Sequence, residues 1–344
     1  MKLGIIGLPV SGKSTVFEAL TREFARSEDK SEDRLGTIDV PDSRIDALSR
    51  MYRPRKTIYA QVQYFLPGKG GRKKDGEKTD AGWTAVRDMD ALIHVVRNFR
   101  MFGRNAPGPK EDFARLDQEL ILSDLAVVEK RLERMEAESK KGKPPDPEER
   151  SLLEKARGLL EAETPLRRDR SLALAPQLRG YAFLSAKPVL VLFNNEDEDT
   201  APPQAGDGLD REQCLVIRGK LEHELAQMSD AEAADLLAEF EIAAPATDRV
   251  IRKSYEVLGL VSFFTVGEDE VRAWTIPEGT AAVEAAGVIH TDIQKGFIRA
   301  ETVSYEDLMA AGSMNAAKKN ATLRLEGKTY EVKDGDIINF RFNV

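Results

Sequence analysis

The sequence has very few of the residues that build disulfides or structural metal centres. It contains one cysteine, Cys214, and three histidines among 344 residues. A single cysteine excludes an internal disulfide, and so few thiol and imidazole groups make a structural zinc site unexpected. We therefore expect a protein of a reducing compartment, the cytoplasm.

Long apolar runs and an excess of positive charge are missing as well. No stretch reaches the roughly 18 uninterrupted apolar residues of a membrane-spanning helix, and the N-terminus lacks the pattern of a signal peptide, so no membrane partner is expected. The 51 Lys and Arg against 59 Asp and Glu give a net charge of −8. This balance excludes a globally basic nucleic-acid coat, and we expect no DNA specificity, although a local basic face is compatible with it.

Strand-like and helical patterns alternate through much of the chain. An apolar strand over Lys2–Ile6 is followed by a glycine-containing loop and a helix over Ser14–Phe24. Further apolar strands are expected at Tyr59–Leu66, Ala91–Val96 and Pro188–Phe193, with helical stretches between them. This alternation predicts an α/β fold with a mostly parallel sheet.

A different pattern occupies the middle of the chain. Within Phe113–Lys141, apolar residues recur in steps of four and three among charged ones, which predicts a long helix packed against another helix. The Gly142–Pro147 segment is a turn that no helix can cross, and a second apolar stripe follows over Leu152–Leu160. We expect an antiparallel helical hairpin inserted into the sheet domain; the alternative is that these helices merely cover the sheet.

From about Ser262 the pattern has period two and predicts a small, strand-rich C-terminal domain. The alternating stretches are Glu270–Ile276, Gly296–Val303, Thr322–Val332 and Ile337–Val344, and tight turns are expected at Glu326–Lys328 and Asp334–Asp336. The expected division is a nucleotide-binding domain over residues 1–110 and 176–261, a helical insertion over 111–175, and a strand-rich domain over 262–344.

One motif carries recognisable chemistry. Residues Gly7–Ser14 read Gly-Leu-Pro-Val-Ser-Gly-Lys-Ser, which matches G-x-x-x-x-G-K-[ST] between a strand and a helix. Backbone N–H groups of such a loop converge on phosphate, Lys13 reaches the β/γ-phosphates, and the Ser14 hydroxyl ligates Mg²⁺. The expected phosphate-binding residues are Gly7, Pro9, Val10, Ser11, Gly12, Lys13, Ser14 and Thr15. The motif specifies neither the nucleotide nor hydrolysis.

This loop, with Thr15, resembles the phosphate loop of the YchF/Obg-like ATPase family, a branch of the translation-factor-class P-loop GTPases. Residues Val127–Arg134 resemble the start of that family's coiled-coil insertion. The C-terminus is similar to the family's TGS domain at Ala273–Ile276, Ala286–Asp292, Lys295–Glu301, Leu323–Lys328, Asp334–Asp336 and Phe340–Val344. The resemblance covers most of the chain. It implies a GTPase-like domain, a coiled-coil hairpin, a ubiquitin-like β-grasp TGS domain, ATP or GTP with Mg²⁺, and a ribosome or RNA partner.

The switch regions depart from the family pattern. The family ends its third strand with Asp-x-Ala-Gly-Leu, in which the Asp holds the Mg²⁺ shell, whereas Val62–Gly68 has no Asp at its end and contains Pro67. The segment between Thr21 and Val40 lacks the family's switch I threonine. We therefore expect weak or absent hydrolysis, unless a carboxylate such as Asp39 or Asp75 substitutes.

Base recognition is altered too. The family has Asn-x-x-Glu where a plain GTPase has Asn-Lys-x-Asp, and here Lys187–Phe193 leads into Asn-Asn-Glu-Asp-Glu. Asn194 with Asp197 is one register, Asn195 with Glu198 is the other, and a solvated loop is a third interpretation. The family's backbone contact near the base corresponds to Arg218 and Gly219. The resemblance thus implies Asn194, Asn195, Asp197, Arg218 and Gly219 as base-binding residues.

The leading hypothesis is a purine-nucleotide-binding protein of this family with a ribosome or RNA partner. Two alternatives stay open: a competent ATPase or GTPase whose metal shell uses substitute residues, and a nucleotide-independent interaction scaffold. The sequence does not identify a catalytic residue.

Overall fold

The computed structural model describes residues 1–24, 32–68, 81–203, 209, 212–239, 242 and 244–343. The chain divides into two compact units, one of Met1–Thr37 with Gln63–Val250 and one of Ile38–Val62 with Ile251–Val344. In the described part of the chain, no helix combines the length and the apolar character that crossing a bilayer requires.

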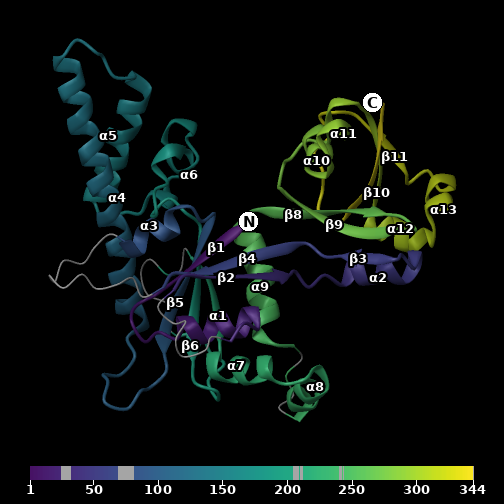
Figure 1. The fold of residues 1–344 in the computed structure, drawn as a ribbon, viewed down its shortest axis with the longest axis horizontal. Helices are drawn as coiled ribbons and strands as arrows, with labels where there is room; N and C mark the ends of the chain where they lie inside the picture. The colour runs from purple at the N-terminus through teal and green to yellow at the C-terminus, as the bar shows by residue number, and fades with distance from the viewer. Residues whose placement is uncertain are drawn as a thin grey trace. The chain divides into compact units, whose positions relative to one another are not determined.

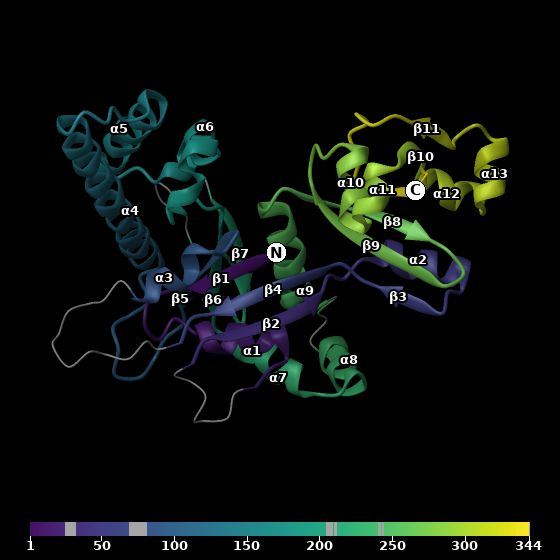
Figure 2. The ribbon, with the colours of Figure 1, turned by 45° about the horizontal axis from the view of Figure 1, so that its top comes forward.

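The first unit is built on a six-stranded sheet of order β2-β4-β1-β5-β6-β7 (Figures 1 and 2). Its strands are β1 (Lys2–Ile6), β2 (Arg34–Asp39), β4 (Gln61–Leu66), β5 (Ala91–Asn98), β6 (Val189–Asn195) and β7 (Gln213–Ile217). From β4 through β1, β5 and β6 to β7, every neighbouring pair is parallel. The predicted mostly parallel α/β sheet is therefore confirmed.

Helices connect these strands. They are α1 (Lys13–Thr21), α3 (Ala81–Arg87), α4 (Pro109–Lys140), α5 (Pro147–Glu161), α6 (Arg170–Ala173), α7 (Gly219–Gln227), α8 (Asp230–Glu239) and α9 (Ala246–Val257). Two 3₁₀ helices, Leu166–Arg168 and Pro176–Tyr181, follow α5 and α6.

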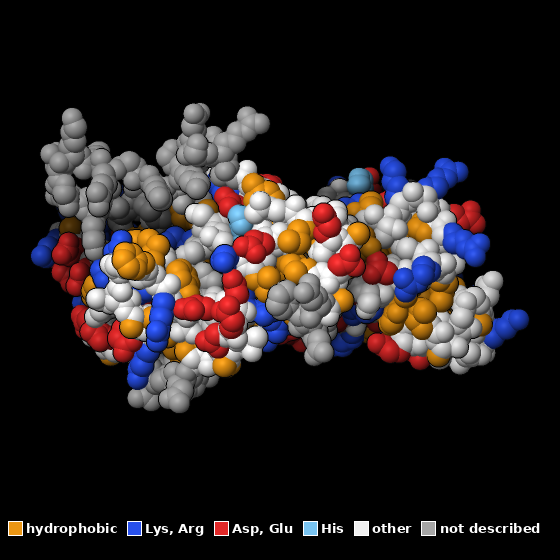
Figure 3. Space-filling view, turned by 90° about the horizontal axis from the view of Figure 1, so that it is seen from below, with side chains coloured by type: hydrophobic (Ala, Val, Ile, Leu, Met, Phe, Trp, Pro, Cys, Tyr) orange, Lys and Arg blue, Asp and Glu red, His pale blue; other side chains and the backbone are white. Residues whose placement is uncertain are grey.

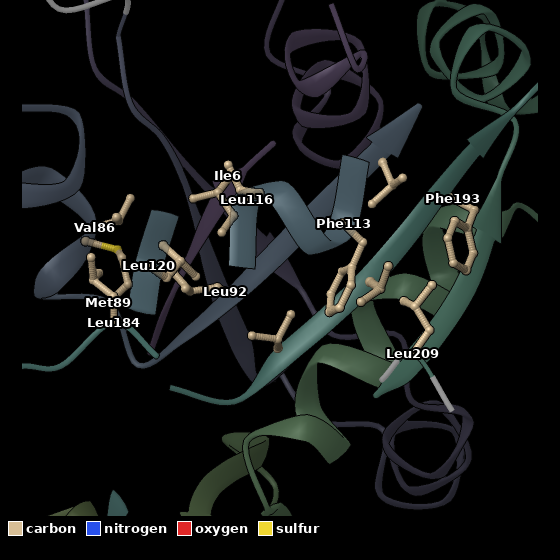
Figure 4. Packing of buried hydrophobic residues seen from close by; sticks show 13 residues of the cluster. Ile6, Val86, Met89, Leu92, Phe113, Leu116, Leu120, Leu184, Phe193 and Leu209 are labelled. Atoms are coloured by element: carbon tan, nitrogen blue, oxygen red, sulfur yellow. The ribbon is translucent and has the colours of Figure 1, made fainter. Parts of the chain in front are cut away.

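Helix α4 has two halves in different surroundings. Phe113, Leu116 and Leu120 of its first half pack with sheet residues such as Leu92 and Phe193 (Figure 4). The second half packs on α5 through Val128, Leu132, Met135, Leu153, Ala156 and Leu160, and the two helices form a hairpin (Figure 1). The first half of α4 therefore covers the sheet, as in one interpretation of the sequence, and the second half forms the helical hairpin of the other.

The second unit has a mixed sheet of order β11-β10-β12-β8-β9-β3. Its elements are α2 (Ser43–Tyr52), β3 (Lys56–Ile58), β8 (Leu260–Val266), β9 (Glu270–Pro277), α10 (Ala282–Ile289), α11 (Thr291–Lys295), β10 (Phe297–Ser304), α12 (Tyr305–Ala311), α13 (Met314–Lys319), β11 (Arg324–Glu326) and β12 (Asp336–Phe342). Helix α10 packs its alanines against Phe263, Ile276 and Phe340 of the sheet. This is the β-grasp arrangement expected from the resemblance.

Residues 38–62 belong to this second unit, although the expected domain division places them with the nucleotide-binding residues. Strand β3 lengthens the sheet by pairing in parallel with β9, from Lys56 opposite Glu270 to Ile58 opposite Arg272. Only three residues form β3, and their partner lies about 200 positions away, so no local pattern signals the pairing. Of the period-two stretch expected over Thr322–Val332, with a tight turn at Glu326–Lys328, only β11 (Arg324–Glu326) ahead of the turn is a strand.

A buried histidine lies in the central strand β5. His94 is 2% exposed, stacks on Phe113 with ring centroids 5.3 Å apart, and its Nε2 has no hydrogen-bond partner among the described groups. Burial lowers the pKa of His94 to about 3, and the positive charges of Arg167 and Lys13 act in the same direction. The imidazole is therefore neutral in the folded protein and serves as part of the core.

This burial predicts a specific loss of stability in acid. The unfolded chain takes up a proton on His94 below its ordinary pKa of about 6.5, whereas the folded chain does not until about pH 3. The contribution to the unfolding free energy is thus lost as the pH falls between these values, by about 2 kcal/mol from pH 7 to 5. Urea unfolding at both pH values should show a smaller fall for His94→Phe than for the parent. The control variant is His290→Phe, which changes an exposed histidine. Equal pH dependence of the parent and His94→Phe would contradict the conclusion that His94 is buried and neutral.

Candidate functional site

The loop between β1 and α1 depends on two glycines. Gly12 has φ +94°, and a Cβ built there would lie 2.1 Å from Asn194 Nδ2. A Cβ at Gly7 would lie 2.4 Å from the carbonyl oxygen of Val95 in β5. Side chains at these positions would collide with the neighbouring strands, so the glycines allow the loop to lie directly against the sheet.

The loop and the first turn of α1 present donors. The first intrahelical bond runs from the N–H of Val16 to the carbonyl of Gly12, so the N–H groups of Ser14 and Thr15 precede it and have no intrahelical acceptor. The Lys13 ammonium donates to the carbonyls of Gly7 and Leu8, each at 2.8 Å. Its charge therefore lies over the loop, where an anion at the helix N-terminus would meet it.

The remaining loop residues differ in exposure. Pro9, Val10 and Ser14 are exposed, and Val10 has φ +62° at the tip of the loop. Ser11 is 2% exposed, and its hydroxyl oxygen is buried with no partner among the described groups. Ser11 therefore contributes to the shape of the loop, while Ser14 offers its hydroxyl at the surface.

Asn194, at the end of β6, joins the loop to the start of α7. Its Nδ2 donates to the carbonyl of Ser11 at 3.1 Å, and its Oδ1 accepts the N–H of Gly219 at 2.9 Å. The side chain is 5% exposed. Asn195 instead donates to the carbonyls of Asp199 and Ala201. Of the two registers considered, the one that begins at Asn194 lies beside the phosphate loop.

Asp197 is held at the N-terminal end of α7. Its Oδ1 accepts the N–H of Leu221 at 3.2 Å, and its backbone carbonyl accepts from the Arg218 guanidinium at 3.2 Å. The Lys220 ammonium lies 3.5 Å from Asp197 Oδ2. These contacts bring Asp197, Arg218 and Gly219 together around one helix start, which sequence spacing alone does not establish.

The end of β4 offers little to a metal ion. Leu66 is 6% exposed there, and Pro67 follows. Asp39 accepts from Gln61 at the first residue of β4, whereas the phosphate loop follows the last residue of the parallel strand β1. Within the described ranges no three His, Cys, Asp or Glu residues are grouped to hold a metal ion. Asp75 lies outside the described residues, as do residues 25–31 of the switch I segment.

Phe99, which sequence analysis did not single out, also borders the loop. Its ring lies 3.9 Å from the position that a Gly12 Cβ would occupy. Asn98 Nδ2 donates to Asn195 Oδ1 at 2.9 Å, which ties the end of β5 to the end of β6. No sequence motif marks Phe99 and Asn98. The feature that could have pointed to them is their position at the end of a central parallel strand, where binding sites of α/β sheets form.

Comparison with known proteins decides the family. A family model named YchF-GTPase_C, described as a protein of unknown function (DUF933), matches residues 260–343. The "Ribosome-binding ATPase YchF" of Bacillus subtilis (strain 168) is 37% identical over 370 aligned positions, which cover 99% of each chain. The chain belongs to the YchF family. The protein of the same name from Escherichia coli O157:H7 is 36% identical and covers 100% of this chain and 99% of its own.

Solved structures agree with the YchF assignment. The structure titled "Structure of the Schizosaccharomyces pombe YchF GTPase" matches with a TM-score of 0.83 at 28% identity, covering 99% of this chain and 97% of that one. A GTP binding protein from Pyrococcus horikoshii OT3 has a TM-score of 0.57 at 18% identity and shares the fold alone. The resemblance to the YchF/Obg-like family and the fold expected from it are confirmed.

The C-terminal unit carries basic side chains that are partly neutralised. Figure 3 shows Lys and Arg side chains on this unit, at the right of the view, interspersed with acidic and apolar ones. Arg341 pairs with Glu301, and Arg324 pairs with Glu326 at 3.1 Å. These ion pairs reduce the positive charge that the sheet presents.

Proposed function

We propose that this chain binds ATP or GTP with Mg²⁺ at the phosphate loop and associates with the ribosome or another RNA partner. The carrying observation is the contact of Gly12 and Ser11 with Asn194, which in turn accepts the Gly219 N–H. It joins the phosphate loop to the segment that the family resemblance assigns to the base. Membership of a family whose relatives are named ribosome-binding ATPases supports the partner, and a ribosome partner would place the protein in the cytoplasm.

The residues present fit a nucleotide-bound Mg²⁺. Ser14 is exposed at the second position of α1, so its hydroxyl is placed to ligate an ion that also contacts phosphate oxygens at the helix N-terminus. The other ligands would be phosphate oxygens and water, as is common for Mg²⁺. Lys13 would add a point charge to the same phosphates.

Hydrolysis is proposed to be weak or absent. Phosphoryl transfer depends on an ordered metal shell and a positioned water. Leu66 and Pro67 occupy the strand end where the family carries its Asp, so the side chain that would orient the metal shell is an apolar one. Binding without rapid turnover is the behaviour that this substitution supports.

Isothermal titration with ATP, GTP, ADP and GDP, with and without Mg²⁺, tests the proposal. We expect triphosphate binding to strengthen with Mg²⁺, and Lys13→Ala to weaken it by roughly 10- to 150-fold, the range of one charge-assisted hydrogen bond. Lys130→Ala, an exposed change on α4, is the matched control. Folded protein that binds none of the four nucleotides would remove the proposal. Phosphate release at about 1 per second or faster, the ordinary range of enzymes, that Lys13→Ala abolishes would refute weak hydrolysis.

A further inference from the structure

The loop that follows β5 presents an aromatic side chain to solvent. The N–H of Arg104 donates to the carbonyl of Met101 at 3.1 Å, which closes a turn whose third residue, Gly103, has φ +72°. Phe102 is 105% exposed and Met101 is 44% exposed. Leaving a phenyl ring in water forgoes about 1.5–3 kcal/mol of burial, so the exposure needs a reason beyond folding.

The loop is braced in this shape. The Arg97 guanidinium donates to the backbone carbonyls of Phe99, Asn105 and Ala106 at 3.2–3.4 Å. The N–H of Arg100 donates to Glu196 Oε1 at 2.8 Å. The Arg97 guanidinium thus joins the two sides of the loop. The bond from Arg100 to Glu196 fixes the loop to the segment that follows β6.

The charge of the segment differs from that of the chain. Residues 91–110 contain Arg97, Arg100, Arg104 and Lys110 and no carboxylate, in a chain of net charge −8. Glu196, Glu198 and Asp199 line a hollow at the base of the loop together with Arg100. Arg104 is exposed two residues beyond Phe102. The tip therefore combines an aromatic face with a guanidinium, while the nearby acids lie at its base.

We propose that Phe102 stacks an unpaired base of single-stranded RNA while Arg104 contacts an adjoining phosphate. Every base has a π-face, and guanidinium groups pair with phosphate, so this combination suits single-stranded nucleic acid. The start of the same loop borders the phosphate loop through Phe99. The inference rests on the RNA partner of the proposed function and names the residues that meet it.

Fluorescence anisotropy with a labelled, unstructured RNA oligonucleotide and the full chain tests this contact. We expect Phe102→Ala to weaken RNA binding by about tenfold or more, and Phe102→Trp to retain it, because a larger ring still stacks. Arg104→Gln should lower the slope of log affinity against log salt by about 0.7, the value for one phosphate contact on a single strand. Leu122→Ala, which truncates another exposed apolar side chain at 57% exposure on α4, should leave RNA binding unchanged.

Two further measurements separate this inference from the proposed function. Titration of each variant with ATP and GTP should give the parent affinity, so a failure of nucleotide binding and a failure of RNA binding are seen independently. Equal RNA affinity of the parent and Phe102→Ala overturns the inference. So does a Phe102→Ala variant that loses co-sedimentation with ribosomes while its RNA affinity stays intact, since the ring would then contact a protein.

Discussion

Replacing Gly12 with alanine should lower nucleotide affinity at least 100-fold. The new Cβ would lie 2.1 Å from Asn194 Nδ2, and φ +94° is a conformation that alanine adopts only with strain. Asn194 has to leave its hydrogen bonds with Ser11 and Gly219, or the loop has to move away from β6. Either change displaces the loop amides by about 1 Å, which is enough to cost about 100-fold where geometry is demanding.

Alanine substitutions at two other glycines distinguish the effect of the Cβ collision with Asn194 from the effect of the strained backbone at positive φ. Gly142 has φ +79° with nothing within 4 Å of a built Cβ, so Gly142→Ala carries the strain alone. Gly158, inside α5, has neither a positive φ nor a neighbour, so Gly158→Ala should be neutral or slightly stabilising. Isothermal titration of the three variants should show a loss for Gly12→Ala only. Parent-like binding by Gly12→Ala would show that the described loop geometry is wrong.

Removing the carboxylate of Asp124 should lower the unfolding free energy of the protein by about 3–5 kcal/mol. Asp124 lies on α4 where the sheet-packed half meets the hairpin half, and its side chain is 0% exposed. It accepts the N–H groups of Leu184 at 3.0 Å and Ser185 at 2.7 Å, and the Arg87 guanidinium lies 3.2 Å away. Asp124→Ala would leave the two backbone N–H groups buried without an acceptor. It would also remove the carboxylate that faces the Arg87 guanidinium.

Urea unfolding followed by circular dichroism measures this loss. Burial raises the pKa of the Asp124 carboxyl, while the Leu184 and Ser185 N–H groups and Arg87 oppose that rise. Asp124→Asn keeps the size and one oxygen acceptor, so it should cost less than Asp124→Ala. Glu129→Ala, an exposed carboxylate on the same helix, should change stability by less than about 0.5 kcal/mol. A cost below 1 kcal/mol for Asp124→Ala would mean that water replaces the carboxylate.

Sequence patterns predicted the structure correctly where a segment's conformation depends on its own residues. The glycine loop, the helix after it and the turn before α5 depend on φ preferences and hydrogen bonds between residues close in sequence. The apolar period of α4 predicted a helix–helix contact, and the structure shows that contact for the second half of the helix. The first half packs on the sheet instead, because the same apolar spacing suits either partner.

The sequence by itself predicted the glycine loop between a strand and a helix, the parallel sheet and a strand-rich C-terminal domain, because glycine positions and apolar periods act over short distances along the chain. The β-grasp arrangement of that domain came from the family resemblance. Tertiary structure alone decided that Asn194 rather than Asn195 lies beside the loop, that residues 38–62 join the second unit, and that Phe102 is held in solvent. Each of these depends on which strand ends meet or which carbonyls a guanidinium reaches. The contact of Asn194 with Ser11 and the pairing of β3 with β9 join residues far apart in sequence, so sheet register and packing set them and no local pattern records them. The Arg97 contacts that hold the Phe102 loop join residues close in sequence, but no motif marks them.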